Sequence, residues 1–170
     1  TGISASVGDY LYFLDSDDYI SANAIELLAD AAVQKRPDFV IGNYEVTGAR
    51  RWAPPLSLGT GFYEGNALVL STYVQGKWYV MAWNKLVSRP LVLQHKLYFQ
   101  EGIVHEDDLW SFKLACMSQS MYVVNETTYY YSMQPDSIMR APSMRNLECR
   151  VLVLGYIYDF IRSSPVSYTH

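Results

Sequence analysis

Three carboxylates lie within four residues, at Asp15, Asp17 and Asp18, directly after the apolar run Tyr10–Leu14. A short apolar run that ends at turn-forming residues predicts a buried strand. Open α/β sheets bind ligands just beyond the carboxyl ends of their strands, which is where these acids would lie. Neighbouring carboxylates repel one another and are stabilised by a cation, so a metal or phosphate site is one interpretation of the pattern. An exposed turn that caps the next helix is the alternative, because aspartate favours both positions.

A second acidic cluster, Glu106-Asp107-Asp108, begins a segment in which apolar residues recur at helical spacing. Acids in the first turn of a helix complement the helix dipole, and by itself the cluster predicts no more than that. His105 precedes the cluster. A single histidine is more often structural, although a role as ligand or in proton transfer stays open.

An aromatic-rich segment, residues 78–93, lies between the two acidic clusters and contains Trp83-Asn84-Lys85. The flat apolar ring of Trp83 either stacks on a sugar or packs in the core, and core packing is the more common use. Asn84 and Lys85 offer hydrogen-bond donors. Their position between the two acidic clusters favours a role in lining a site.

The elements that would position these residues can be read from turn signals and periodicity. A helix follows the acidic loop, with a capping box formed by Asn23 and Glu26, and Pro37 ends it. The other expected elements are a strand at 39–46, a loop at 47–61 that contains Arg50, Arg51 and Trp52, a helix at 64–74, strands at 121–124 and 127–131, and a helix that begins at Ser143. Strand, helix and strand in this order favour an α/β fold.

The final helix has the most regular apolar stripe in the chain. Its members are Leu147, Val151, Leu154, Tyr158 and Ile161. Such a stripe forms one face of a helix, and we expect it to pack on the sheet.

The segment Gly8–Asp18, GDYLYFLDSDD, resembles the G-E-Y-hydrophobic-x-F-L-D-S-D-D segment of family 2 glycosyltransferases, which have the GT-A fold. The sequence WNKL at 83–86 resembles the W-N-K-L-[YF] motif of that family, and Glu106-Asp107 resembles its E-D motif. Residues 129–138 resemble its Y-x-Y-R-x-x-x-x-S-[IM] ending, except that Ser132 replaces the usual basic residue. The resemblance implies an α/β fold, the later part of a GT-A domain, with a mixed sheet flanked by helices.

The resemblance also implies roles for individual residues. Asp15 and Asp17 would bind Mg²⁺ or Mn²⁺, with Asp17 as the direct ligand, and Asp107 would be the catalytic base. The residues implied to bind the substrate are Asp15, Trp83, Asn84, Lys85 and Glu106. The implied reaction moves a sugar, with inversion, from a nucleotide-sugar donor to a hydroxyl of a glycan or lipid-linked acceptor. It requires that Asp107 and Asp17 face the same cleft.

Two alternatives stay open at this point. A phosphotransferase of the haloacid dehalogenase type also has a strand that ends in Asp-x-Asp, but it would leave the W-N-K-L and E-D matches unexplained. The second alternative is a folded but catalytically inactive part of a transferase. As a family 2 transferase, active or inactive, the chain is expected to be a single partial GT-A domain over residues 1–170, without its N-terminal nucleotide-binding strands. A second copy in a homodimer or a rearranged terminus is then expected to cover the exposed edge of the Tyr10–Leu14 strand.

Composition narrows the class of protein. Half of the 170 residues are hydrophobic, which is typical of a globular domain, and a net charge of −4 provides no basic footprint for nucleic acid. Cys116 and Cys149 lack the spacing of a metal site and are expected to be reduced core residues of a cytoplasmic protein. No apolar run reaches the ~18 residues of a membrane span, and no signal peptide is visible. The family resemblance adds peripheral contact with the inner membrane face and synthesis of bacterial surface polysaccharide as expectations.

Overall fold

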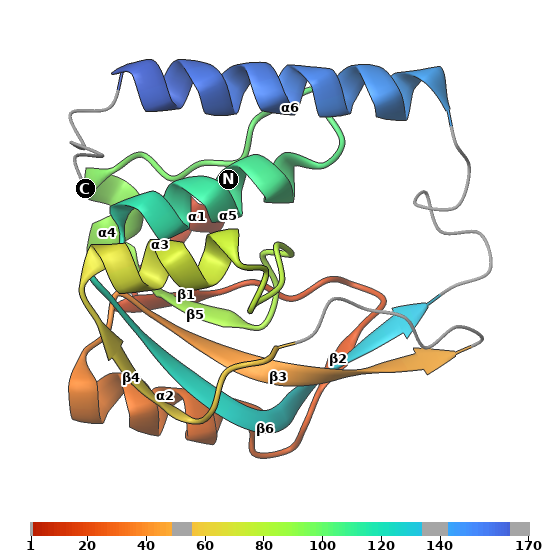
Figure 1. Ribbon diagram of the computed structural model, residues 1–170. Coiled ribbons are helices and arrows are strands. Elements are labelled where there is room, and N and C mark those ends of the chain that lie inside the picture. The colour runs from red at the N-terminus through yellow and green to blue at the C-terminus, as the bar shows by residue number, and fades with distance from the viewer. Residues whose placement is uncertain (1, 49–55, 134–142, 164–170) are drawn as a thin grey trace.

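The computed structural model describes residues 2–48, 56–133 and 143–163, which form a β-sheet with helices on both faces (Figure 1). The strands are β1 (Tyr10–Tyr12), β2 (Tyr19–Ile20), β3 (Phe39–Gly48), β4 (Gly61–Glu64), β5 (Lys85–Ser88) and β6 (Ser120–Met133). The helices are α1 (Gly2–Ala5), α2 (Ala24–Lys35), α3 (Asn66–Val74), α4 (Arg89–Gln94), α5 (Glu106–Met117) and α6 (Met144–Ser163). The candidate loop residues Arg50, Arg51 and Trp52 lie outside the described residues.

The sheet is mixed, as expected for this α/β fold. Its strand order is β1-β5-β3-β6-β2, and β4 also pairs with β6. The long central strands β3 and β6 are parallel, whereas every other pair among the described residues is antiparallel. Strand β1 lies at the end of this order and pairs, within the described part of the chain, with β5 alone. The expectation that another chain copy or a terminus covers its outer edge therefore stays a prediction.

Strand β6 is continuous, so the expectation of two separate strands at 121–124 and 127–131 was wrong. Its pairing with β3 is irregular in the middle, because Gly42 pairs with Val124 and Asn43 pairs with Thr127. The two expected segments are the two halves of one strand on either side of this irregularity. On its other side, the first half pairs with β4 and the second half pairs with β2.

The two faces of the sheet are covered by different helices. Figure 1 shows α2 on one face, α3 and α5 on the other, and α6 farther from the sheet, beyond α5. Alternate residues of β3 point to opposite faces: Phe39 and Ile41 join the large core cluster with Trp110, whereas Val40 packs with Leu28 of α2. The packed sheet therefore carries the loops and helix ends that present polar groups.

The ends of α2 agree only partly with the sequence prediction. The helix ends before Pro37, with Arg36 in the left-handed conformation. At its beginning Asn23 is the N-cap residue, but it makes no side-chain capping hydrogen bond. Its side-chain oxygen instead accepts a hydrogen bond of 3.0 Å from the Ser21 hydroxyl, so the predicted capping box is absent.

The apolar stripe of α6 does not pack on the sheet, which contradicts the sequence prediction. Val151 and Leu154 are 62% and 66% exposed, whereas Cys149 and Val153 on the other side of the helix are buried. Helix α6 packs against α5, and the Phe160 and Phe112 rings are in contact at a centroid distance of 6.1 Å. Periodicity identifies an apolar stripe but does not show which neighbour covers it.

Two expectations from composition can be compared with the fold. Cys116 and Cys149 are both buried thiols, as predicted. Among the described residues, no helix combines the length and the apolar character needed to cross a bilayer.

Candidate active site

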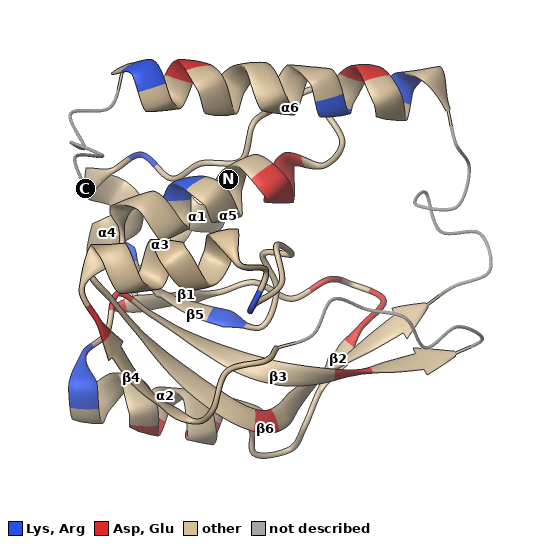
Figure 2. Ribbon diagram, in the orientation of Figure 1, with Lys and Arg blue, Asp and Glu red and all other residues tan. Residues whose placement is uncertain are grey.

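The two acidic clusters meet at one cleft of about 260 Å³. Asp15 lines it from the loop after β1, and Glu106 and Asp107 line it from the first turn of α5. The other lining residues are Phe13, Leu14, Ala82, Trp83 and Phe99. Figure 2 shows the two acidic segments in red, in the loop between β1 and β2 and at the beginning of α5. Residues far apart in the sequence are thus brought to one site.

The acidic loop is a tight turn in which the Asp18 N–H donates to the Asp15 carbonyl at 3.2 Å. One carboxylate oxygen from each of Asp15, Asp17 and Asp18 lies within 4.8 Å of the others, and the first two side chains are exposed. Carboxylate oxygens are the ligands that Mg²⁺ and Mn²⁺ prefer, so this donor set fits such a cation. Asp17 is near Asp15 but not among the residues that line the cleft, so Asp15 is the acid that shares the cleft with Asp107.

The acidic side chains in and beside the cleft repel one another. The Asp15 side chain is exposed overall, but partial desolvation of its carboxylate raises its pKa, and the charges of Asp18, Asp17 and Glu106 raise this pKa further. A bound cation would offset this repulsion, which is a second reason why the loop fits a divalent metal.

Asp107 has the environment of a base that works near neutral pH. Burial raises the pKa of Asp107 to about 6, while the Lys85 ammonium and the Ala82 backbone N–H act in the opposite direction. Glu106 and Asp15 raise this pKa as well. A carboxylate with this pKa is ionised at pH 7 and still a better proton acceptor than an exposed aspartate.

Lys85 lies behind the wall of the cleft and is completely buried. Its Nζ donates hydrogen bonds to the carbonyl oxygens of Tyr79, at 3.2 Å, and Met81. The same nitrogen lies 4.1 Å from the centroid of the Tyr79 ring. Burial lowers the pKa of Lys85 to about 7, although the nearby Asp107 carboxylate favours the charged form. Lys85 therefore influences the cleft from within the core, through its electrostatic interaction with Asp107.

Asn84 is also completely buried and ties three strands together. Its side-chain oxygen accepts hydrogen bonds from the hydroxyls of Tyr12, at 3.1 Å, and Thr128, at 2.8 Å. Its amide nitrogen donates to the Asn43 carbonyl at 3.0 Å. The family resemblance implies substrate contacts for Asn84 and Lys85, but in the structure their polar atoms hydrogen-bond to protein partners.

Trp83 borders the cleft, yet only 3% of it is exposed. Its ring stacks on Tyr129 at a centroid distance of 4.4 Å and on Tyr79 at 5.0 Å. These contacts match the core-packing alternative for Trp83, which makes the indole a structural part of the cleft wall.

Two residues near the clusters, Tyr129 and His105, have positions that the sequence did not indicate. Tyr129 contacts the acidic loop through its hydroxyl, which accepts a hydrogen bond from the Asp15 N–H at 3.3 Å. The only sequence signal for it is its place in the Y-x-Y element. His105 is the N-cap residue of α5 and has a left-handed backbone conformation. His105 is not among the residues that line the cleft.

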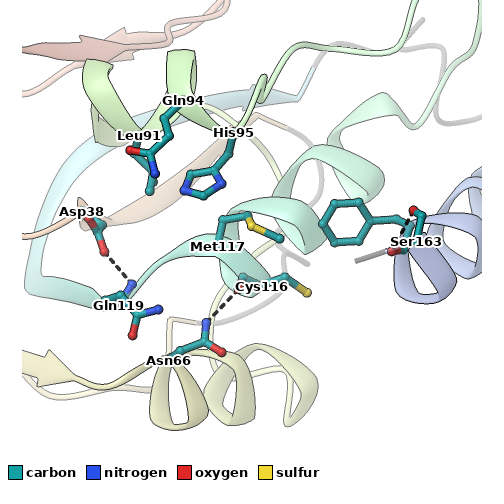
Figure 3. Close-up of a pocket in the computed structure, with 10 residues that line it drawn as sticks. Asp38, Asn66, Leu91, Gln94, His95, Cys116, Met117, Gln119 and Ser163 are labelled. Atoms are coloured by element: carbon teal, nitrogen blue, oxygen red, sulfur yellow. Dashed lines mark hydrogen bonds between the residues drawn. The ribbon is translucent and has the colours of Figure 1, made fainter. Parts of the chain in front are cut away.

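A larger cavity of about 710 Å³ lies elsewhere, among α4, the end of α5 and the end of α6 (Figure 3). Two of its polar side chains are used in structural hydrogen bonds. Asp38 accepts from the Gln119 and Ser120 N–H groups, and Asn66 donates to carbonyls at the end of α5. The smaller cleft is the better candidate for chemistry, because the acidic residues converge there.

The fold and the cleft define a GT-A glycosyltransferase domain. The sequence profile of glycosyl transferase family 2 matches residues 1–91, and the chain belongs to this family. It is 26% identical over 131 residues to the poly(ribitol-phosphate) beta-N-acetylglucosaminyltransferase TarP of Staphylococcus aureus, an alignment that covers 76% of this chain and 39% of TarP. It is 29% identical over 154 residues to the uncharacterized glycosyltransferase EpsJ of Bacillus subtilis, covering 84% of this chain and 43% of EpsJ.

A solved structure has the same fold. The crystal structure of S. aureus TarS residues 1–349 in complex with UDP-GlcNAc superposes with a TM-score of 0.72 at 17% identity, covering 92% of this chain and 45% of TarS. The chain thus spans less than half of the length of each of these relatives. These matches confirm the family and fold expected from the motifs and leave no support for the haloacid dehalogenase alternative.

Proposed function

We propose that this chain forms the catalytic part of a metal-dependent, inverting glycosyltransferase that uses a nucleotide-sugar donor. The observation that carries the proposal is the convergence of Asp15, Glu106 and Asp107 on one cleft in a chain of this family. Asp15 and Asp17 would hold a divalent cation beside the donor diphosphate, and Asp107 would serve the acceptor.

Different residues of the cleft would have different roles in the reaction. Asp107 accepts the proton of the acceptor hydroxyl as this oxygen attacks the anomeric carbon, and the bond to the nucleoside diphosphate breaks on the opposite side of the sugar, which inverts the anomeric centre. A bound Mg²⁺ or Mn²⁺ would stabilise the negative charge of the leaving diphosphate. Lys85 favours the ionised form of Asp107, and the Ala82 N–H orients its carboxylate.

The names of the relatives suggest which donor and acceptor to test first. The TarS crystals contain UDP-GlcNAc, and the name of TarP specifies transfer of N-acetylglucosamine to poly(ribitol-phosphate). We propose UDP-GlcNAc as the first donor to test and a hydroxyl-rich glycan or lipid-linked acceptor of bacterial surface polysaccharide synthesis as the acceptor class.

Isothermal titration of UDP and GDP, with and without Mn²⁺, tests the donor site in the chain and in Asp17→Ala. We expect binding of one nucleotide that requires Mn²⁺ and that Asp17→Ala abolishes. Metal-independent binding, or equal binding by Asp17→Ala, would contradict the proposed role of the acidic loop. Absence of binding by the wild-type chain would favour the alternative, a folded part of a transferase without a donor site of its own.

Two expected partners are tested separately. Sedimentation velocity over a range of concentrations shows whether the chain forms the homodimer expected from the outer edge of β1, and a monomer at all concentrations would contradict it. Flotation with liposomes of anionic lipid tests peripheral membrane binding, which recovery of the chain in the lipid-free fraction would exclude.

A further inference from the structure

The acidic loop is attached to strand β6 by a small set of hydrogen bonds. The hydroxyl of Tyr129 donates to Asp18 Oδ2 at 2.7 Å and accepts from the backbone N–H of Asp15 at 3.3 Å. The second oxygen of Asp18, Oδ1, accepts from the Ser132 backbone N–H at 2.7 Å. One tyrosine hydroxyl therefore joins both ends of the loop.

These contacts divide the three loop acids into two kinds. Both oxygens of the Asp18 carboxylate face donors of β6. Asp15 and Asp17, by contrast, have exposed side chains that lie beside each other. Asp18 is thus an anchor for the loop, and the other two acids are presented to the solvent side, where a cation could reach them.

The ring of Tyr129 is held in a fixed position, so its hydroxyl can serve as a reference point for the loop. The residue is completely buried. Its ring is parallel to the Trp83 ring within 3°, and Trp83 in turn stacks on Tyr79. The segment that contains Trp83 also contains Ala82, whose N–H donates to Asp107. The aromatic stack is therefore linked to the acidic loop through the Tyr129 hydroxyl and to the candidate base through Ala82, the neighbour of Trp83 in the chain.

We propose that Tyr129 is a positioning residue of the donor site, whose hydroxyl fixes Asp18 and the Asp15 backbone so that Asp15 and Asp17 are preorganised to bind a divalent cation and the donor diphosphate. The proposal rests on the proposed transferase function. Hydrogen-bond partners that orient metal ligands typically change metal affinity 10- to 100-fold when they are removed, because the ligands must then be ordered at the moment of binding.

The test is Tyr129→Phe, which removes the hydroxyl and keeps the stacked ring. Titration of UDP in the presence of Mn²⁺ should give an affinity about 10- to 100-fold weaker than that of the wild-type chain. Hydrogen exchange without any ligand should show faster exchange of the Asp15 amide, which loses its acceptor. The Ser132 amide should follow, because Asp18 is no longer held.

Tyr79→Phe is the matched control. Tyr79 is also completely buried and also stacks on Trp83, and its hydroxyl donates to the Gly42 carbonyl at 2.8 Å. This variant should lower the melting temperature but keep the Mn²⁺-dependent UDP affinity and the protection of the Asp15 amide. The comparison separates loss of a buried hydroxyl from loss of loop position.

Asp18→Asn completes a double-mutant cycle with Tyr129→Phe. If the two side chains act through one hydrogen bond, the double variant should bind Mn²⁺-UDP about as well as whichever single variant binds it less tightly. If the two substitutions weaken Mn²⁺-UDP binding independently, so that their effects multiply, the proposed link is wrong. The link is also wrong if Tyr129→Phe binds Mn²⁺-UDP with wild-type affinity, or if Tyr129→Phe and Tyr79→Phe lose the same amount of affinity. A wild-type chain that does not bind Mn²⁺-UDP would overturn the donor site itself and the inference with it, an outcome distinct from a failure of Tyr129→Phe alone.

Discussion

Replacing Lys85 by methionine tests whether the cleft is supported by a buried cation that titrates near neutral pH. In the folded chain burial lowers the pKa of Lys85 from its ordinary 10.5 to about 7. Between these two values the unfolded chain binds a proton that the folded chain does not, so the free energy of unfolding rises with pH across this window. Lys85→Met removes this dependence and keeps a side chain of similar length in the core.

The magnitude follows from the two pKa values. One pH unit inside the window corresponds to about 1.4 kcal/mol, and because Lys85 is half titrated near pH 7, integration from pH 7 to pH 9 gives about 2 kcal/mol. The Asp107 carboxylate adds to the difference in the same direction. Without the cation its pKa rises above about 6, so the variant loses stability as pH rises through that higher value. The unpaired Tyr79 and Met81 carbonyls lower the stability of the variant at every pH, by about 1–3 kcal/mol each.

Urea denaturation of both proteins at pH 7, 8 and 9 measures the effect. We expect the stability of the wild-type chain minus that of Lys85→Met to increase by about 2 kcal/mol over this range. Groups that titrate equally in both proteins cancel in this difference. A difference that is constant with pH would refute the reasoning, because Lys85 would then keep one protonation state throughout.

Three other predictions address the base, the strand network and α6. Asp107→Asn should lower the rate of sugar transfer about 100- to 10,000-fold, measured by release of UDP, while Mn²⁺-dependent UDP binding persists; retained turnover would exclude Asp107 as the base. Gly42→Ala should destabilise the chain by about 1–3 kcal/mol in urea, because the added methyl group would overlap the Thr128 hydroxyl, and a neutral effect would contradict this packing. Leu154→Asp should change the stability by less than about 0.5 kcal/mol, whereas Val153→Asp should cost several times more because it buries a charge; the reverse order would mean that α6 packs through its other face.

Local sequence patterns were sufficient to locate the acidic loop, the helix that begins at Glu106 and the α/β class. These features depend on neighbouring residues: a short apolar run before turn formers, acids in the first turn of a helix, and strand alternation. The continuity of β6 could not be predicted, because it depends on pairing with β3. Strand β3 pairs with β6 from Phe39 to Gly48, despite an irregularity at Asn43.

The roles of buried polar residues were decided by the tertiary structure. Asn84 and Lys85 carry the same polar atoms whether they face a substrate or the core. Only the tertiary structure shows that groups of β1, β3 and β6 surround the Asn84 amide and that the Tyr79 and Met81 carbonyls accept from Lys85. The same holds for α6, whose stripe is regular in sequence while its burial depends on which face meets α5. Periodicity specifies a face, but the neighbour that covers it is a long-range property.

The sequence by itself determined that two acidic clusters exist, which local elements present them and which family their motifs resemble. Only the tertiary structure decided that Asp15 and Asp107 share a cleft and that Tyr129, 114 residues beyond Asp15, fixes the loop. The physical reason is that a carboxylate's function depends on its burial, its neighbouring charges and its hydrogen-bond donors. In this chain those come from segments that the fold brings together and that no local pattern connects.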